Sequence, residues 1–169
     1  STPAKSKEIK PLTKEESTKV IEVAIRRYAR KPKGELTKAD YENVTLITGL
    51  YSRKLTSVKG LENLTQLKQL SLDKNQLTDV KGLEKLTQLT SLSLGGNQLT
   101  SVKGLENLTQ LKVLALWSNQ LTELPKGLEK LTQLTYLALQ SNQLTEIPKG
   151  LEKLTKLRSL NLAGNQLTK

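Results

Sequence analysis

A leucine-spaced phrase that returns five times constrains the fold of this 169-residue chain more than any other feature. Its opening leucines are separated by 22, 22, 23 and 23 residues and stand at positions 67, 89, 111, 134 and 157. A repeat of this length is one supersecondary unit that cannot bury its apolar face alone, so neighbouring copies stack and share a core. The chain is therefore expected to form a solenoid.

Each copy reads Leu-x-x-Leu-x-Leu-x-x-Asn-x-Leu, and this pattern together with the period is that of a leucine-rich repeat. We expect the first six or so positions to form a strand, with alternate residues pointing into the core and onto a concave face. The Asn should turn the chain, because its buried side chain can bond backbone groups of neighbouring coils. The segments between copies are too short for full α-helices and predict short 3-10 turns on the convex side.

The predicted fold class is thus an α/β repeat: a leucine-rich-repeat solenoid with a curved parallel β-sheet and an α-helical N-terminal cap. Residues 1–11 are rich in Lys and Pro, with little to bury, and predict a flexible leader. Residues 12–43 form the predicted cap. Residues 44–169 form the solenoid, which comprises one degenerate repeat and five copies, the last incomplete.

Two capping boxes define the cap. Thr13 with Glu16 starts a pattern of apolar residues at helical spacing, which predicts one amphipathic helix. Thr37 with Asp40 repeats the arrangement and predicts a short helical turn that leads into the first strand.

The degenerate repeat covers residues 44–58 and differs from the later copies in two ways. Arg53 stands where the others have Asn. The stretch from Val44 to Leu55 is also one residue longer than the matching segments, which predicts a local bulge or change of register.

Composition excludes several kinds of chemistry. The chain has no Cys and no His, so disulfides, thiolate catalysis, histidine-ligated zinc and Ser-His-Asp triads are excluded. Its carboxylates are spread along the coils, and we find no pair placed for acid–base work. We therefore expect no enzyme, cofactor or metal site. No apolar run approaches the roughly 20 residues needed to span a bilayer, which argues against a membrane span.

The formal net charge of +11 invites a nucleic-acid interpretation. Residues 1–35 hold 10 Lys and Arg against 5 Glu, so almost half of the excess precedes the repeats. Within the repeats a column of lysines is followed three places later by a column of glutamates, which predicts a solvated and largely self-neutralising outer face. Nucleic-acid sites usually add stacking aromatics, and this chain has one Trp, four Tyr and no Phe, which argues against nucleic acid.

Candidate binding residues are those that differ between copies at outward-facing strand positions. The third, fifth and seventh positions place large apolar residues in two adjacent copies, with small residues between them, so that a shallow apolar dish is expected on the concave face. Exposed Trp and Tyr in a concavity are typical of protein interfaces. The predicted partner-binding residues are Trp117, Tyr136, Val113, Ala115, Ala138 and Gln140. Tyr51 is expected to extend the surface towards the cap, and Asp73 with Lys74 to supply polar contacts at its rim.

The repeats Asn-Gln-Leu-Thr and Gly-Leu-Glu-x-Leu-Thr-Gln, preceded by the entry segment 36–45, resemble those of internalin-type bacterial surface proteins. The resemblance covers roughly residues 13–169. It implies a solenoid on the bacterial surface or in secreted form that binds a protein ligand on its concave face, although the sequence does not exclude the cytoplasm. The last two repeat steps, of the 23-residue Leu/Ile-Pro-Lys-Gly type, depart from that family's pattern.

The last copy raises a further expectation. Leu157, Leu160, Leu162 and Leu167 complete a strand and turn with no further coil after them. We expect either a fragment of a longer protein or self-association through this edge. Two other functions stay open: a basic module that binds an anionic surface or polymer, and a structural or engineered repeat scaffold.

Overall fold

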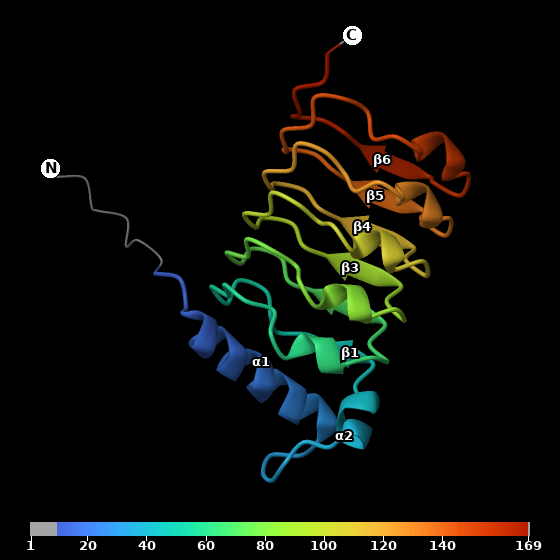
Figure 1. The fold of residues 1–169 in the computed structure, drawn as a ribbon. Helices are drawn as coiled ribbons and strands as arrows, with labels where there is room; N and C mark the ends of the chain where they lie inside the picture. Colours follow the sequence, from blue (N-terminus) through green and yellow to red (C-terminus); the bar gives the residue numbers. More distant parts are fainter. Residues whose placement is uncertain (1–9, 169) are drawn as a thin grey trace, which may run out of the picture.

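The computed structural model describes residues 10–168; the predicted leader falls on residues 1–9, outside this range, and on Lys10 and Pro11, which precede the first helix. Helix α1 spans Lys14–Ala29 and starts with the predicted capping box between Thr13 and Glu16. Its apolar stripe packs against the core, with Ile21 and Ile25 fully buried. Figure 1 shows that α1 covers one end of the stack of coils. No helix in the described part of the chain has the length and apolar character to cross a membrane.

The second capping box forms as well. Helix α2 spans Lys38–Glu42, with Thr37 as its N-cap and the Asp40 carboxylate bonded to the Thr37 N–H at 2.7 Å. The Asp40 carboxylate also accepts a hydrogen bond from the Lys31 ammonium at 2.7 Å, which joins α2 to the end of α1. This contact, together with the hydrogen bonds from Thr37, lowers the pKa of Asp40 to about 2.

The degenerate repeat carries the expected bulge. Strand β1, Leu46–Ile47, is only two residues long and pairs with β2 through Ile47 and Leu70. The extra residue lies directly after β1, where Gly49 adopts a φ of 84° that favours glycine. Arg53 donates to the Gly49 carbonyl at 3.2 Å and so closes the bulge.

Six parallel strands stack in sequence order (Figure 1), as predicted for a leucine-rich-repeat sheet. The prediction of strands about six residues long was wrong, because the regular pairing covers three residues in each full copy. The backbone ladder nevertheless continues on both sides, as in the bonds from the Lys112 N–H to Thr90 and from the Ser118 N–H to Gln140. The strands after β1 are β2 Gln69–Ser71, β3 Ser91–Ser93, β4 Val113–Ala115, β5 Tyr136–Ala138 and β6 Ser159–Asn161.

Short 3-10 turns line the opposite side, as the sequence predicts. In the first three of them the glutamate carboxylate accepts a hydrogen bond from the glycine N–H two residues earlier, for example Glu84 from Gly82 at 2.7 Å. Leucines from both sides meet in one continuous core. The turns are η1 Leu61–Asn63, η2 Leu83–Lys85, η3 Leu105–Asn107, η4 Leu128–Lys130 and η5 Leu151–Lys153.

The repeated Asn forms the predicted ladder. The Asn97 amide donates to the carbonyl of Leu94 in its own coil at 3.0 Å and to that of Leu72 in the preceding coil at 3.1 Å. Its oxygen accepts from the Leu77 N–H at 3.1 Å. One buried side chain thus satisfies the backbone groups that the bend of two successive coils would leave unpaired.

The final copy is less buried than its predecessors. Leu160 is 41% exposed, whereas the equivalent Leu137 in the preceding strand is fully buried. Leu157 and Leu162 are partly buried, and Leu167 is 37% exposed. Leu160 and Leu167 are therefore the most accessible of these four leucines.

Candidate functional site

The exposed side of strands β1–β6 is here called the sheet face. All the predicted binding residues lie on it or just beyond the ends of its strands. Val113 pairs with Tyr136, and Ala115 pairs with Ala138 on the same two strands. Tyr136 is 39% exposed, while Ala115 and Ala138 are 6% and 0% exposed. The centre of the predicted dish is consequently a closed floor, and Tyr136 is its principal accessible apolar group.

Trp117 does not stand free in the solvent. Its indole ring lies over Gly95 and Gly96 of the preceding coil, so closely that a Cβ atom built on Gly95 would be 2.0 Å from the Trp117 Cε2. Trp117 is partly buried as a result. Gly95 and Gly96 therefore form the surface on which the indole packs. Only the outer part of the ring is available to a partner.

Asp73 is engaged within the protein. One of its carboxylate oxygens accepts hydrogen bonds from the Ser93 hydroxyl at 2.6 Å and from the Gly95 N–H at 2.7 Å. These bonds connect the second coil to the third, on which the indole of Trp117 rests. Asp73 thus supports the sheet face, and its charge is partly compensated by donors of the protein itself.

Tyr51 and Lys74 form the end of the sheet face nearest the cap. The Lys74 ammonium lies 5.5 Å from the centroid of the Tyr51 ring, within the range of a cation–π contact. The contact with Tyr51 raises the pKa of the Lys74 ammonium, and the nearby Asp73 charge raises it further. Tyr51 is 50% exposed, so its ring is accessible.

Gln140 follows β5 and is aligned with Trp117 of the preceding coil, since the Ser118 N–H donates to the Gln140 carbonyl at 2.9 Å. The Oε1 atom of its side chain is buried without a hydrogen-bond partner among the described residues. Sequence reasoning placed Gln140 at the site but could not indicate this unpaired acceptor.

Comparisons with known proteins agree with this geometry. The family model described as "Leucine rich repeat" matches residues 109–167. A leucine-rich-repeat protein of Leptospira interrogans is 37% identical over 68% of this chain, with a TM-score of 0.65. The functional domain of InlJ from Listeria monocytogenes is 28% identical over 86% of this chain, with a TM-score of 0.75. This chain spans only 30% and 31% of those two structures.

Internalin C2 of Listeria monocytogenes is 26% identical, with a TM-score of 0.57, and the match covers 87% of this chain and 84% of that one. This chain is a leucine-rich-repeat solenoid that resembles the internalins. No curated protein matches it significantly in sequence. The leucine-rich-repeat fold implies a protein-interaction module, which agrees with the sequence-based hypothesis at that level.

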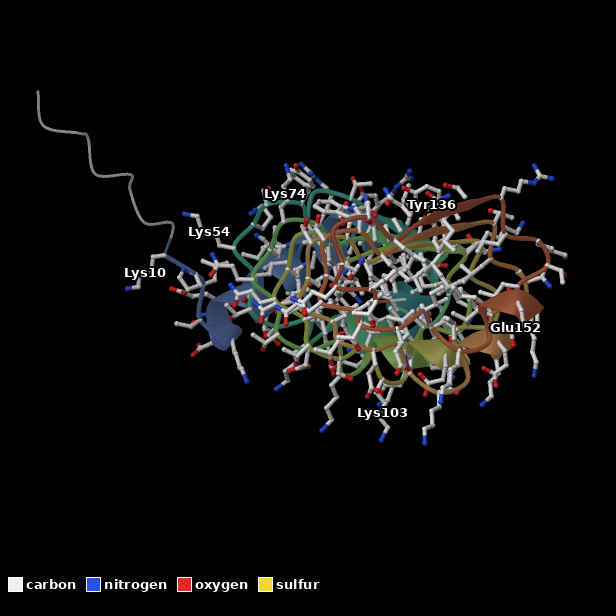
Figure 2. All side chains as sticks on the ribbon, turned by 90° about the horizontal axis from the view of Figure 1, so that it is seen from above. Lys10, Lys54, Lys74, Lys103, Tyr136 and Glu152 are labelled. Atoms are coloured by element: carbon white, nitrogen blue, oxygen red, sulfur yellow. The ribbon has the colours of Figure 1, made fainter. Side chains whose placement is uncertain are left out.

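The convex side of this leucine-rich-repeat solenoid carries the lysine and glutamate columns. The lysine column does not pair with the glutamate column: within residues 10–168 all four ion pairs lie in the cap, between residues 15 and 42. In three coils the glutamates bond glycine N–H groups instead. The lysines are exposed at positions 59, 81, 103, 126 and 149, and Figure 2 shows Lys103 on the side opposite to Tyr136 and Lys74.

Sequence reasoning missed a groove between the last two convex segments of the solenoid. The groove has a volume of about 530 Å³ and lies between residues 122–129 and 144–149. Ile147 beside it is 63% exposed, while the following Pro148 is buried. The signal was the extra residue of the 23-residue copies, where Leu124 or Ile147 precedes Pro; Ile147 is exposed, whereas Leu124 is partly buried against the core.

Proposed function

We propose that this protein is a non-enzymatic binding module that holds a protein partner on its sheet face. The observation that carries the proposal is the exposed Tyr136 on β5, next to Val113 and above a floor closed by Ala115 and Ala138. An aromatic anchor surrounded by buried small residues resembles the centre of a protein interface, where few side chains supply most of the binding energy.

A rigid scaffold supports the same proposal. The Asn ladder and the contact of Trp117 with Gly95 hold the sheet face in one shape before any partner binds. Preformed surfaces bind with less loss of conformational entropy. Likeness to internalin C2, InlJ and the Leptospira protein supports a bacterial source and, as part of this proposal, a location on the cell surface or in secreted form. Cell fractionation with an antibody against the chain would test that location.

Affinity capture with mass spectrometry tests the binding site. The wild-type chain is compared with Tyr136→Ala, and Ile147→Ala serves as a matched control because it removes an exposed apolar side chain from the convex side. A partner that is retained by the control and lost with Tyr136→Ala, and that then binds the purified chain directly, would support the proposal. If neither variant loses the partner, the result would favour the alternative in which the basic cap binds an anionic surface or polymer.

The exposed edge at β6 supports a second contact, which we propose for a chain of these 169 residues: self-association through Leu160 and its neighbours. Exposed leucines on an edge strand, which pairs on one side only among the described residues, favour pairing with another chain. Light scattering of the wild-type chain and of Leu160→Lys over a range of concentrations would decide. A monomer at all concentrations for both chains would refute this contact.

A further inference from the structure

The charges of the solenoid are divided unequally between its two sides. Each sheet segment runs from the opening leucine of a copy, or from Val44 in the degenerate repeat, to the leucine two places after the Asn position. The segments are 44–55, 67–77, 89–99, 111–121, 134–144 and 157–167. They contain a single acidic residue, Asp73. Their basic residues are all exposed and are Arg53, Lys54, Lys68, Lys74, Lys112 and Arg158.

The convex segments, in contrast, are balanced. They cover residues 56–64, 78–86, 100–108, 122–131 and 145–154 and hold eight lysines and eight carboxylates. The basic excess of the solenoid between residues 44 and 168 therefore lies on the sheet side, apart from Lys156 just before the last strand. Asp73, which is bonded to Ser93 and Gly95, is thus the one carboxylate of the sheet segments that opposes their six basic residues.

Three of these basic residues are also aligned with Tyr136, the apolar anchor of the sheet face. Lys68, Lys112 and Arg158 occupy the same position directly before their strands, and the backbone ladder through Thr90 and Thr135 aligns them. They alternate with threonines, so successive bases are two strands, or about 10 Å, apart. Tyr136 on β5 consequently has Lys112 on one neighbouring strand and Arg158 on the other.

From this arrangement we infer that the partner on the sheet face is an acidic protein segment, in which an apolar side chain contacts Tyr136 and carboxylates on either side meet Lys112 and Arg158. The inference rests on the proposed function and adds the chemistry of the partner. Complementary charge sets orientation and accelerates association, while the apolar contact supplies affinity. A nucleic-acid strand fits less well, because successive nucleobases need several stacking aromatics, whereas Tyr136 is the exposed aromatic between Lys112 and Arg158 and Trp117 lies partly buried on Gly95.

Charge reversal tests the inference. Lys112→Glu/Arg158→Glu changes the sheet face, and Lys103→Glu/Lys149→Glu makes the same change in net charge on the convex side. The probes are a fluorescent peptide rich in Glu and Leu, the same peptide with Lys in place of Glu, and an oligo-dT strand, followed by fluorescence anisotropy. We expect only the Glu peptide to bind through the sheet face and the sheet-face variant to weaken it about tenfold or more. Raising the salt concentration should weaken it as well.

If both variants weaken binding of the Glu peptide equally, the inference is overturned, because the attraction would then depend on net charge and not on Lys112 and Arg158. Binding of oligo-dT with the same dependence on Lys112 and Arg158, and no binding of the Glu peptide, would assign the patch to a nucleic acid. Failure of every probe, combined with a captured protein that still requires Tyr136, would refute the acidic partner while leaving the proposed function intact. Circular dichroism of both variants checks that they fold.

Discussion

The indole of Trp117 occupies the space in which a side chain at position 95 would begin, since a Cβ atom on Gly95 would lie 2.0 Å from the ring. Residue 95 does not have a positive φ, so its backbone accepts other residues. The glycine is required there because of the ring, and the ring is held because of the glycine.

The substitution Gly95→Ala should therefore lower the free energy of unfolding by about 1–3 kcal/mol, as an overpacked contact does. Trp117 should move outwards, and its fluorescence emission should shift to the red. In a Trp117→Ala background the same substitution should be neutral or slightly stabilising, because the clash is gone and alanine restricts the unfolded chain. Urea unfolding of the four chains gives the coupling energy. Equal costs of Gly95→Ala in both backgrounds would contradict the packing described.

Asn97→Ala tests the ladder. It removes an acceptor from the Leu77 N–H and a donor from the carbonyls of Leu72 and Leu94, all in buried surroundings. An unpaired buried group costs about 1–3 kcal/mol, so the total loss of stability should be about 3 kcal/mol or more. The matched control is Asn165→Ala, whose equivalent bonds are partly exposed and should cost less. Chemical denaturation measures the free energy of unfolding of both variants. A larger loss of stability in Asn165→Ala than in Asn97→Ala would be inconsistent with burial as the cause.

Asp40 should make the cap sensitive to acid. Its pKa is lowered from the ordinary 3.8 to about 2 by the Lys31 ammonium first and by Thr37 next. The unfolded chain binds more protons in this window, so the stabilisation is fully present above pH 3.8 and is lost as the pH falls through about 2. Asp40→Asn should remove this part of the acid dependence, and Lys31→Ala should shift it to higher pH. Thermal unfolding between those pH values measures both effects, and an unchanged acid limb in Asp40→Asn would disprove the linkage.

Glu84 has a structural role that its exposed position in the sequence pattern conceals. Its carboxylate accepts from the Gly82 N–H at 2.7 Å, and it is partly buried. Glu84→Ala should cost about 1–2 kcal/mol, as expected for a hydrogen bond to a charged group with some exposure. Glu123→Ala, which removes an exposed convex carboxylate, should cost less than about 0.5 kcal/mol. Similar losses for the two variants, measured by urea unfolding, would argue against the Gly82 contact.

Most of the scaffold could be predicted because each prediction depended on local or strictly repeated patterns. Thr13 and Thr37 cap their helices through residues three places away, and the Asn column bonds coils that the period itself brings together. The bulge after β1 followed from counting one extra residue between Val44 and Leu55. Strand length was overestimated because the leucine pattern extends beyond the three residues with regular pairing.

The candidate site was predictable only as a set of positions. Comparison of the copies selected Trp117, Tyr136 and Gln140, but it could not show that the indole rests on Gly95 or that Gln140 has an unpaired oxygen. Both features depend on the conformation of a side chain and on how it packs against a neighbouring coil about 22 residues away in the sequence. The bonds of the glutamate column were missed for a related reason: the contact of Glu84 with the Gly82 N–H depends on the path of the backbone in the turn, which the spacing of charged residues does not show.

The amino-acid sequence by itself determined the repeat, the parallel sheet, the Asn ladder and the capped helices, because a fixed period leaves one way to stack the apolar positions. Only the tertiary structure decided which groups stay accessible. Contacts between coils bury Ala115 and Ala138, seat Trp117 on Gly95 and leave Tyr136 between Lys112 and Arg158. Such contacts depend on side-chain packing across strands, which a one-dimensional pattern does not specify.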